Sequence, residues 1–143
     1  MSKILQIGVK VILLNSAKDK FLGIKRNKNK ILQEKEDIDI PGGRIEIGEE
    51  PLEGLTRELI EEIGYSLKSD LVLLDASNIV NNEKLQIVRL TYIAENEGIE
   101  IKNITLGNEH EGSVLVDFSE NKNNHPLLNK SIAKYKSIFG KEA

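Results

Sequence analysis

The stretch "GGRIEIGEEPLEGLTRELIEEIGY", Gly42 to Tyr65, places seven carboxylates in a segment that also carries a helical pattern. Apolar residues recur in it at spacings of three and four, at Leu52, Leu55, Leu59 and Ile63. This spacing predicts a helix over residues 51–63 with one buried stripe. Pro51 suits the first turn of such a helix, and Gly64 suits the position just after its end.

Three glutamates, Glu58, Glu61 and Glu62, fall within one sector of this helix, away from the apolar stripe. Like charges three or four residues apart each cost an isolated helix roughly 0.2 to 0.5 kcal/mol, and Arg57 offsets only part of that cost through Glu61. A solvated acidic face is one interpretation. The preceding "PGG" favours another, because glycine lets a backbone carbonyl approach a ligand closely. Carboxylates with a carbonyl form the oxygen set that suits Mg²⁺ or Mn²⁺.

The spacing from Gly43 through Glu49 to "RELIEEIGY", residues 57–65, resembles the Nudix box, with every fixed position filled. The departures are Tyr65, where that family more often has an aliphatic residue, and Ile38, where many members have tryptophan. The strand order on both sides is also similar to the family's. The resemblance implies an α/β protein, a Nudix-type α/β/α sandwich with a mixed β-sheet, formed by one domain over residues 1–143.

The resemblance also implies a hydrolase that uses Mg²⁺, with Mn²⁺ as a substitute, to cleave a diphosphate bond in a nucleoside diphosphate linked to another group. Divalent cations that bridge phosphate oxygens stabilise the charge that develops when water attacks phosphorus. The implied metal ligands are three carboxylates and one carbonyl: Glu58, Glu61, Glu62 and Gly43. Glu62 or Glu58 would double as the base. Arg57 would orient the glutamates, and Glu49 would support the loop or a second metal.

Relatives often supply a further acidic residue from a late loop, and "GNEHEGSVLVDF", residues 107–118, has that form. Glu109 matches best as a catalytic residue, with Glu111 and His110 as near alternatives. The other interpretation is a solvated loop carboxylate.

Single basic residues near these positions are the predicted substrate-binding groups. Lys25 and Arg26 end the second predicted strand, where relatives often place a cation, and Arg44 follows the double glycine. Each such residue is more often surface than site. The run "KRNKNK" lacks interleaved aromatic residues, so it predicts a solvated loop and no nucleic-acid partner. A nucleotide base would have few stacking partners in this chain: Tyr92, Phe21 or Tyr65, if any of them faces the site.

The rest of the chain predicts strands on both sides of the helix and a helix at the end. A hairpin is predicted over 4–14 and 20–25, and a loop over 26–37. Further strands are predicted over 38–40, 70–77, 84–95, 98–106 and 113–118. In the last helix, Leu128, Ile132, Tyr135 and Phe139 share one face. This order predicts an α/β sandwich with a mixed sheet.

The composition excludes several function classes. The 143 residues contain no cysteine, so disulfides, thiolate metal sites and a cysteine nucleophile are excluded. The formal net charge of −3 gives no global field that attracts nucleic acid or an anionic membrane. The N-terminal apolar run lacks a cleavage site, which predicts a cytoplasmic protein without a membrane partner. It is expected to be a monomer or homodimer.

The substrate is predicted by elimination. Subfamily markers for ADP-sugars and dinucleoside polyphosphates, a proline and a tyrosine beyond the box, are absent from "SNIVNNEK", residues 77–84. A small-molecule nucleotide, a nucleoside or deoxynucleoside triphosphate, is therefore favoured, with the monophosphate and pyrophosphate as products. The alternatives are a nucleotide-binding sensor without turnover and a hydrolase of ADP-sugars or dinucleoside polyphosphates.

Overall fold

The protein has an α/β architecture in the computed structural model, which describes residues 2–26, 38–106 and 110–140. The elements in chain order are β1 (Ile4–Leu13), β2 (Lys20–Arg26), β3 (Ile38–Asp39), β4 (Gly42–Arg44), α1 (Pro51–Ile63), β5 (Val72–Asn81), β6 (Leu85–Ala94), the 3₁₀ turn η1 (Ile101–Asn103), β7 (His110–Asp117) and α2 (Pro126–Phe139). No helix within the described ranges is long and apolar enough to cross a bilayer.

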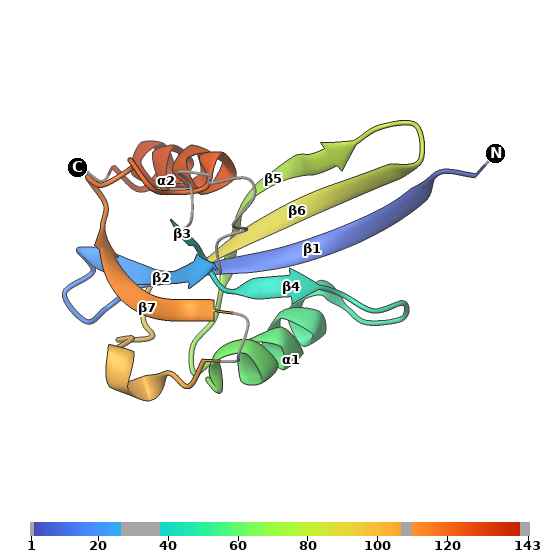
Figure 1. Cartoon of the computed structure of the whole chain (residues 1–143). Helices are drawn as coiled ribbons and strands as arrows, with labels where there is room; N and C mark the ends of the chain where they lie inside the picture. Colours follow the sequence, from blue (N-terminus) through green and yellow to red (C-terminus); the bar gives the residue numbers. More distant parts are fainter. Residues whose placement is uncertain (1, 27–37, 107–109, 141–143) are drawn as a thin grey trace.

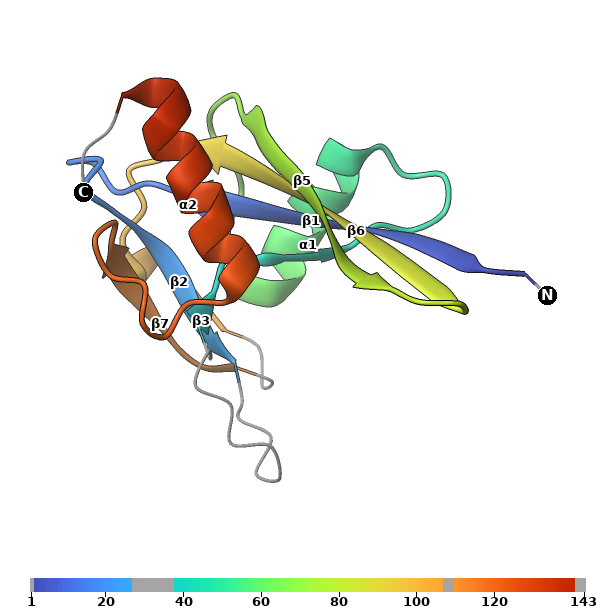
Figure 2. The ribbon, with the colours of Figure 1, turned by 90° about the horizontal axis from the view of Figure 1, so that it is seen from above.

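The strands form two sheets. The larger has the order β4-β1-β6-β5 and is mixed, because β1 pairs parallel with β6 and antiparallel with β4. The smaller has the order β3-β2-β7 and is antiparallel. The two long helices lie on opposite sides of the larger sheet (Figure 1), so the predicted α/β/α sandwich with a mixed sheet is confirmed. Seen from above, α2 lies over the strands, with β2 and β7 on one side of it in the view and β5 and β6 on the other (Figure 2).

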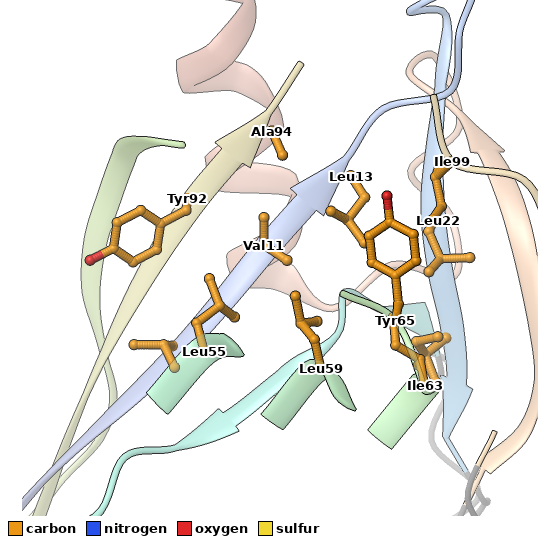
Figure 3. Packing of buried hydrophobic residues seen from close by; sticks show 12 residues of the cluster. Val11, Leu13, Leu22, Leu55, Leu59, Ile63, Tyr65, Tyr92, Ala94 and Ile99 are labelled. Atoms are coloured by element: carbon orange, nitrogen blue, oxygen red, sulfur yellow. The ribbon is translucent and has the colours of Figure 1, made fainter. Parts of the chain in front are cut away.

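From Gly8 onward, strand β1 is largely buried on both of its faces, to which successive side chains point in turn. Val9, Val11 and Leu13 belong to the cluster that α1 completes with Leu55, Leu59 and Ile63 (Figure 3). Ile12 and Leu14 belong to a second cluster, which α2 completes with Leu128, Ile132 and Tyr135. One strand therefore provides a wall for two cores, and the catalytic candidates on α1 are attached to the first of them.

The predicted hairpin between the first two strands is wrong. β1 and β2 lie in different sheets and share only an isolated bridge between Leu14 and Phe21. Strand β1 already has β4 on one side and β6 on the other, so no edge remains for β2 to pair along its length. The chain turns after Leu14 and enters the second sheet.

Two further local predictions are corrected. Residues 98–106 form no strand: Gly98 has a φ of +61°, and η1 follows at Ile101–Asn103. Leu52, predicted to lie in the buried stripe of α1, is 46% exposed. Gly54 is buried in that turn and packs on Ile45, because the helix approaches the loop after β4 too closely for a larger side chain.

Candidate active site

Helix α1 holds the predicted glutamates and has defined ends. At its start, the Glu50 N–H donates to Glu53 Oε1 over 2.8 Å, which satisfies a backbone donor that the helix leaves free. At its end, Gly64 adopts the left-handed conformation with φ 62°, as glycine does readily. The helix therefore begins and ends where its sequence predicts.

The double glycine brings the backbone of β4 against two of the helix carboxylates. The Gly42 N–H donates to Glu62 Oε1 over 2.8 Å. Gly42 has a φ of +144°, and a Cβ there would overlap the Val9 carbonyl. A Cβ on Gly43 would collide with the Glu58 carboxylate. Glycine is therefore needed at both positions for the strand and the glutamates to meet.

Arg57 lies at the centre of the acidic residues. Its Nε donates to Glu49 Oε2 over 2.8 Å, and its Nη2 donates to Glu49 Oε1 over 2.9 Å. Its Nη1 donates to Glu58 Oε1 at 3.0 Å and to Glu61 Oε1 at 3.2 Å. A further bond from Nη2 reaches the Arg44 carbonyl at 3.1 Å. Arg57 thus contacts Glu58 and Glu61, two of the three glutamates that it was predicted to orient.

These contacts change the acidity of the pair. Hydrogen bonds from Arg57, and then the Glu46 N–H, lower the pKa of Glu49 to about 2. The hydrogen bond to Glu49, and after it the one to Glu58, raises the pKa of Arg57 further above its ordinary value. Both groups are therefore charged across the whole neutral range, and the Glu49 carboxylate is engaged with Arg57 at both oxygens.

The chemistry of the donors fits a hard divalent cation. Glu58, Glu61 and Glu62 offer only carboxylate oxygens, and the backbone of Gly43 lies against the Glu58 carboxylate. In the described part of the chain, no three carboxylate or imidazole groups enclose a common metal position. Glu58 and Glu61 instead contact Arg57, which is the nearby cation. The metal roles of these residues and of Glu49 stay predictions.

The predicted substrate-binding cations Arg44 and Lys25 lie in two different hollows. Arg44 is exposed and lines a hollow of about 250 Å³ together with Lys10 and Arg89. Lys25 lines a different hollow of about 380 Å³, along β2 and β7. Arg26 ends β2 opposite His110, and its side chain is outside the described part. Glu109 and most of the predicted loop over 26–37 also lie outside the described residues, and the side chains of His110 and Glu111 are not described.

A buried ion pair, which the sequence pattern did not indicate, joins β6 of the larger sheet to β3 of the smaller sheet. Arg89 of β6 donates from Nη1 to Asp39 Oδ2 over 2.9 Å and from Nη2 to Asp39 Oδ1 over 2.8 Å. The two side chains are only 2% and 5% exposed. Burial alone would raise the pKa of Asp39, but Lys10 and Arg89 outweigh it, and the pKa lies below its ordinary value. The available signal was a lone arginine inside the apolar strand "LQIVRLTYIA".

Comparisons with known proteins agree with this fold. No curated protein matches the chain. Among solved structures, a MutT protein from Methanosarcina mazei Go1 is 20% identical, with 99% of each chain covered and a TM-score of 0.76. A MutT Nudix hydrolase from Burkholderia pseudomallei is 18% identical over 92% of this chain and 98% of its own, with a TM-score of 0.73. An Ap4A hydrolase from C. elegans is 14% identical over 96% and 98%, with a TM-score of 0.64. The family model described as the NUDIX domain matches residues 4–136, and the chain therefore belongs to the Nudix hydrolase family.

Proposed function

We propose that this Nudix hydrolase uses Mg²⁺ to cleave a nucleoside or deoxynucleoside triphosphate into the nucleoside monophosphate and pyrophosphate. The carrying observation is the meeting of the α1 carboxylates with the double glycine, where Gly42 binds Glu62 and Gly43 packs on Glu58. This contact supports a site at which the glutamate oxygens and the Gly43 carbonyl would act together. Such a site is suited to a substrate that brings its own negative charge together with a cation.

The roles of the chain's own residues follow from their contacts. Glu58, Glu61 and Glu62 would hold Mg²⁺ together with the Gly43 carbonyl. When bound, the cation would neutralise phosphate oxygens and the charge that develops on them. Glu62 or Glu58 would accept the proton of the attacking water. The bidentate pair with Glu49 fixes the Arg57 guanidinium, so that its remaining donors hold Glu58 and Glu61 in place.

Other compounds with a diphosphate bond should be tested together with the triphosphates. The C. elegans neighbour is an Ap4A hydrolase, so its fold accommodates a dinucleoside polyphosphate. ADP-sugars form the third class. The alternative that is not an enzyme is a sensor that binds nucleotides without hydrolysing them. The intact glutamate set supports hydrolysis over that alternative, because a binder needs no base.

The test is a substrate panel with metal added and removed. Nucleoside and deoxynucleoside triphosphates, ADP-ribose and diadenosine tetraphosphate are incubated with Mg²⁺, and the products are separated by ion exchange. We expect monophosphate and pyrophosphate from the triphosphates, loss of turnover in EDTA, and recovery with Mg²⁺ or Mn²⁺. Full activity in the metal-stripped protein would refute the metal role. Turnover of ADP-ribose alone would refute the substrate, and no turnover of any compound would favour the sensor.

A further inference from the structure

A tyrosine follows the C-terminal cap of α1, at a position where the family more often has an aliphatic residue. The ring of Tyr65 lies between Leu13 and Leu22 in the cluster that α1 completes, and its hydroxyl points away from Ile63 (Figure 3). The residue is only 4% exposed, so its ring is not available to stack on a base. A buried phenol hydroxyl normally has a hydrogen-bond partner.

The partner is Glu97, a buried carboxylate that collects several donors. The Tyr65 hydroxyl donates to Glu97 Oε1 over 2.6 Å, and the Ser69 N–H donates to Oε2 over 2.7 Å. The Ser69 hydroxyl and the Lys68 N–H also donate to this carboxylate. Burial alone would raise the pKa of Glu97, but hydrogen bonds from Ser69 and then Tyr65 outweigh it, and the pKa lies below its ordinary value. Glu97 is therefore an ionised group in the interior that no step of the proposed chemistry uses.

The turn that carries Glu97 is fixed to the larger sheet. It follows directly after β6, which ends at Ala94. The Leu14 N–H donates to the Ala94 carbonyl over 3.1 Å, and the Ile99 N–H donates to the Leu14 carbonyl over 3.0 Å. Gly98 permits the turn with a φ of +61°. Glu97 is thus held at the ends of the two central strands, β1 and β6.

The last turn of α1 is therefore attached to the sheet from both sides of β1. On the β4 side, Glu62 accepts from the Gly42 N–H. On the β6 side, Tyr65 donates to Glu97. The Tyr65 N–H also donates back to the Leu59 carbonyl over 3.3 Å, which joins its backbone to the end of the helix. Two attachments on opposite sides fix the rotation of the helix end, whereas one attachment would let it turn.

Resting on the proposed function, we infer that Glu97 is a positioning residue for hydrolysis, which acts through Tyr65 to hold Glu62 against the Gly42 N–H. A catalytic group displaced by roughly 1 Å can cost about 10²-fold in rate. An aliphatic residue at position 65 would fill the core without making this contact. The tyrosine hydroxyl therefore adds a constraint on the carboxylate face that the spacing of the box does not itself require.

The first measurement is hydrogen exchange of backbone amides by NMR, in the full chain without metal or nucleotide. The Gly42 amide reports its contact with Glu62, and the Val11 amide, which donates to the Pro41 carbonyl over 3.1 Å, reports the neighbouring strand contact. Tyr65→Phe removes only the hydroxyl. We expect exchange at Gly42 to become about 10-fold faster, at the low end for a hydrogen bond to a charged group, with Val11 unchanged.

Glu97→Gln gives the same test from the other partner. It keeps the size of the side chain but places an amide N–H₂ among donors, so we expect faster exchange at Gly42 again. Each variant should lower kcat about 10-fold and change KM by less than about twofold, because the substrate contacts remain. The double variant should lose little more than the slower single variant, since both break one contact.

The matched control is the other buried contact between a tyrosine and a glutamate. The Tyr135 hydroxyl donates to Glu95 Oε2 over 2.9 Å, in the cluster that α2 completes. Tyr135→Phe removes a hydroxyl of the same kind without touching α1. It should keep kcat and the Gly42 exchange rate of the parent protein.

Three results would overturn the inference. They are unchanged exchange at Gly42 in both Tyr65→Phe and Glu97→Gln, equal acceleration at Gly42 and Val11, or the same losses in Tyr135→Phe. Parent turnover that both variants retain refutes the inference alone. Selective acceleration at Gly42 in a protein that hydrolyses no compound of the panel refutes the proposed hydrolysis and leaves the contact between Glu97 and the helix end.

Discussion

Arg57 and Arg89 pair with carboxylates on opposite sides of the larger sheet, and the two clusters differ in charge and burial. Arg57 is 26% exposed and contacts Glu49, Glu58 and Glu61, so its cluster keeps an excess of negative charge. Arg89 is 2% exposed and forms an ion pair with Asp39 that is itself neutral, and Lys10 is a further cation near Asp39. An uncompensated anionic surface is suited to bind a cation. A neutral buried pair is suited to hold strands together and to present donors.

The energetics of the two clusters should differ accordingly. Water and salt screen the partly exposed pairs of Arg57, which should contribute less to stability than a buried pair. The buried pair is costly to break, because removal of one partner leaves a charge without compensation in the interior. Variants in the Arg57 cluster should therefore lose activity while staying folded, and variants in the Arg89 cluster should lose stability first.

The largest effect is expected from the glutamates themselves. Glu58→Gln, Glu61→Gln and Glu62→Gln should each lower turnover by about 10²- to 10⁴-fold, the range for loss of a catalytic acid or base. Thermal stability should change little, because glutamine keeps the size and helix propensity of glutamate. Glu83→Gln removes the same charge from the exposed turn before β6 and is the control. If all three variants turn over substrate at the rate of the parent protein, the acidic face is only a solvated surface.

The second prediction breaks the buried pair. Arg89→Met should lower the free energy of unfolding by about 3 to 5 kcal/mol, measured by urea denaturation. Asp39→Asn/Arg89→Met should recover most of that loss, because neither charge remains. Arg57→Met, the same substitution in the exposed cluster, should lower turnover with little shift of the unfolding midpoint. Equal destabilisation by the two single arginine variants would remove the distinction between the clusters.

The third prediction concerns the contact between the double glycine and the helix. Gly43→Ala should lower turnover by about 10²-fold, because the new methyl group displaces the Glu58 carboxylate. The fold should tolerate it, since the end of a flexible side chain can rotate away. In a double-mutant cycle, Glu58→Gln should then add much less than its separate effect. Additive losses would show that Gly43→Ala acts through something other than Glu58.

The smallest effect is expected from pH on stability. Hydrogen bonds and nearby cations outweigh burial and hold the pKa of Asp39 below its ordinary value of 3.8. The folded state therefore binds this proton more weakly, so the contribution of Asp39 is complete above pH 4 or so and is lost as the pH falls through the folded value. Urea midpoints measured from pH 6 to pH 3 should fall less steeply in Asp39→Asn/Arg89→Met. A parallel fall would show that Asp39 contributes nothing to the acid sensitivity.

High salt separates the two clusters in the same measurement. The pKa of Glu49, near 2, also predicts a loss of stability in acid. Its partly exposed pair with Arg57 should be weakened in 0.5 M salt, taken as roughly three times physiological ionic strength, and the buried pair should be weakened much less. The difference between the parent protein and Asp39→Asn/Arg89→Met should therefore persist at high salt.

The sequence alone determined the helix, its ends and the acidic residues on it. These features depend on contacts between residues three or four apart and on the special conformations of proline and glycine, so they are encoded locally. The spacing of the box predicted the family for the same reason. The sequence could not say which way Glu62 turns, because its contact with the Gly42 N–H joins α1 to β4, a separate element.

Tertiary structure decided the features that join distant segments. Strand β2 pairs with β7 instead of β1, because both edges of β1 are taken by β4 and β6. Asp39 and Arg89 are 50 residues apart in sequence and meet only when the two sheets pack. Nothing in the local sequence around Asp39 or Arg89 marks the two residues as partners. Local periodicity therefore fixes which residues form the helix face, whereas strand partners and buried charge pairs depend on which distant surface each strand covers.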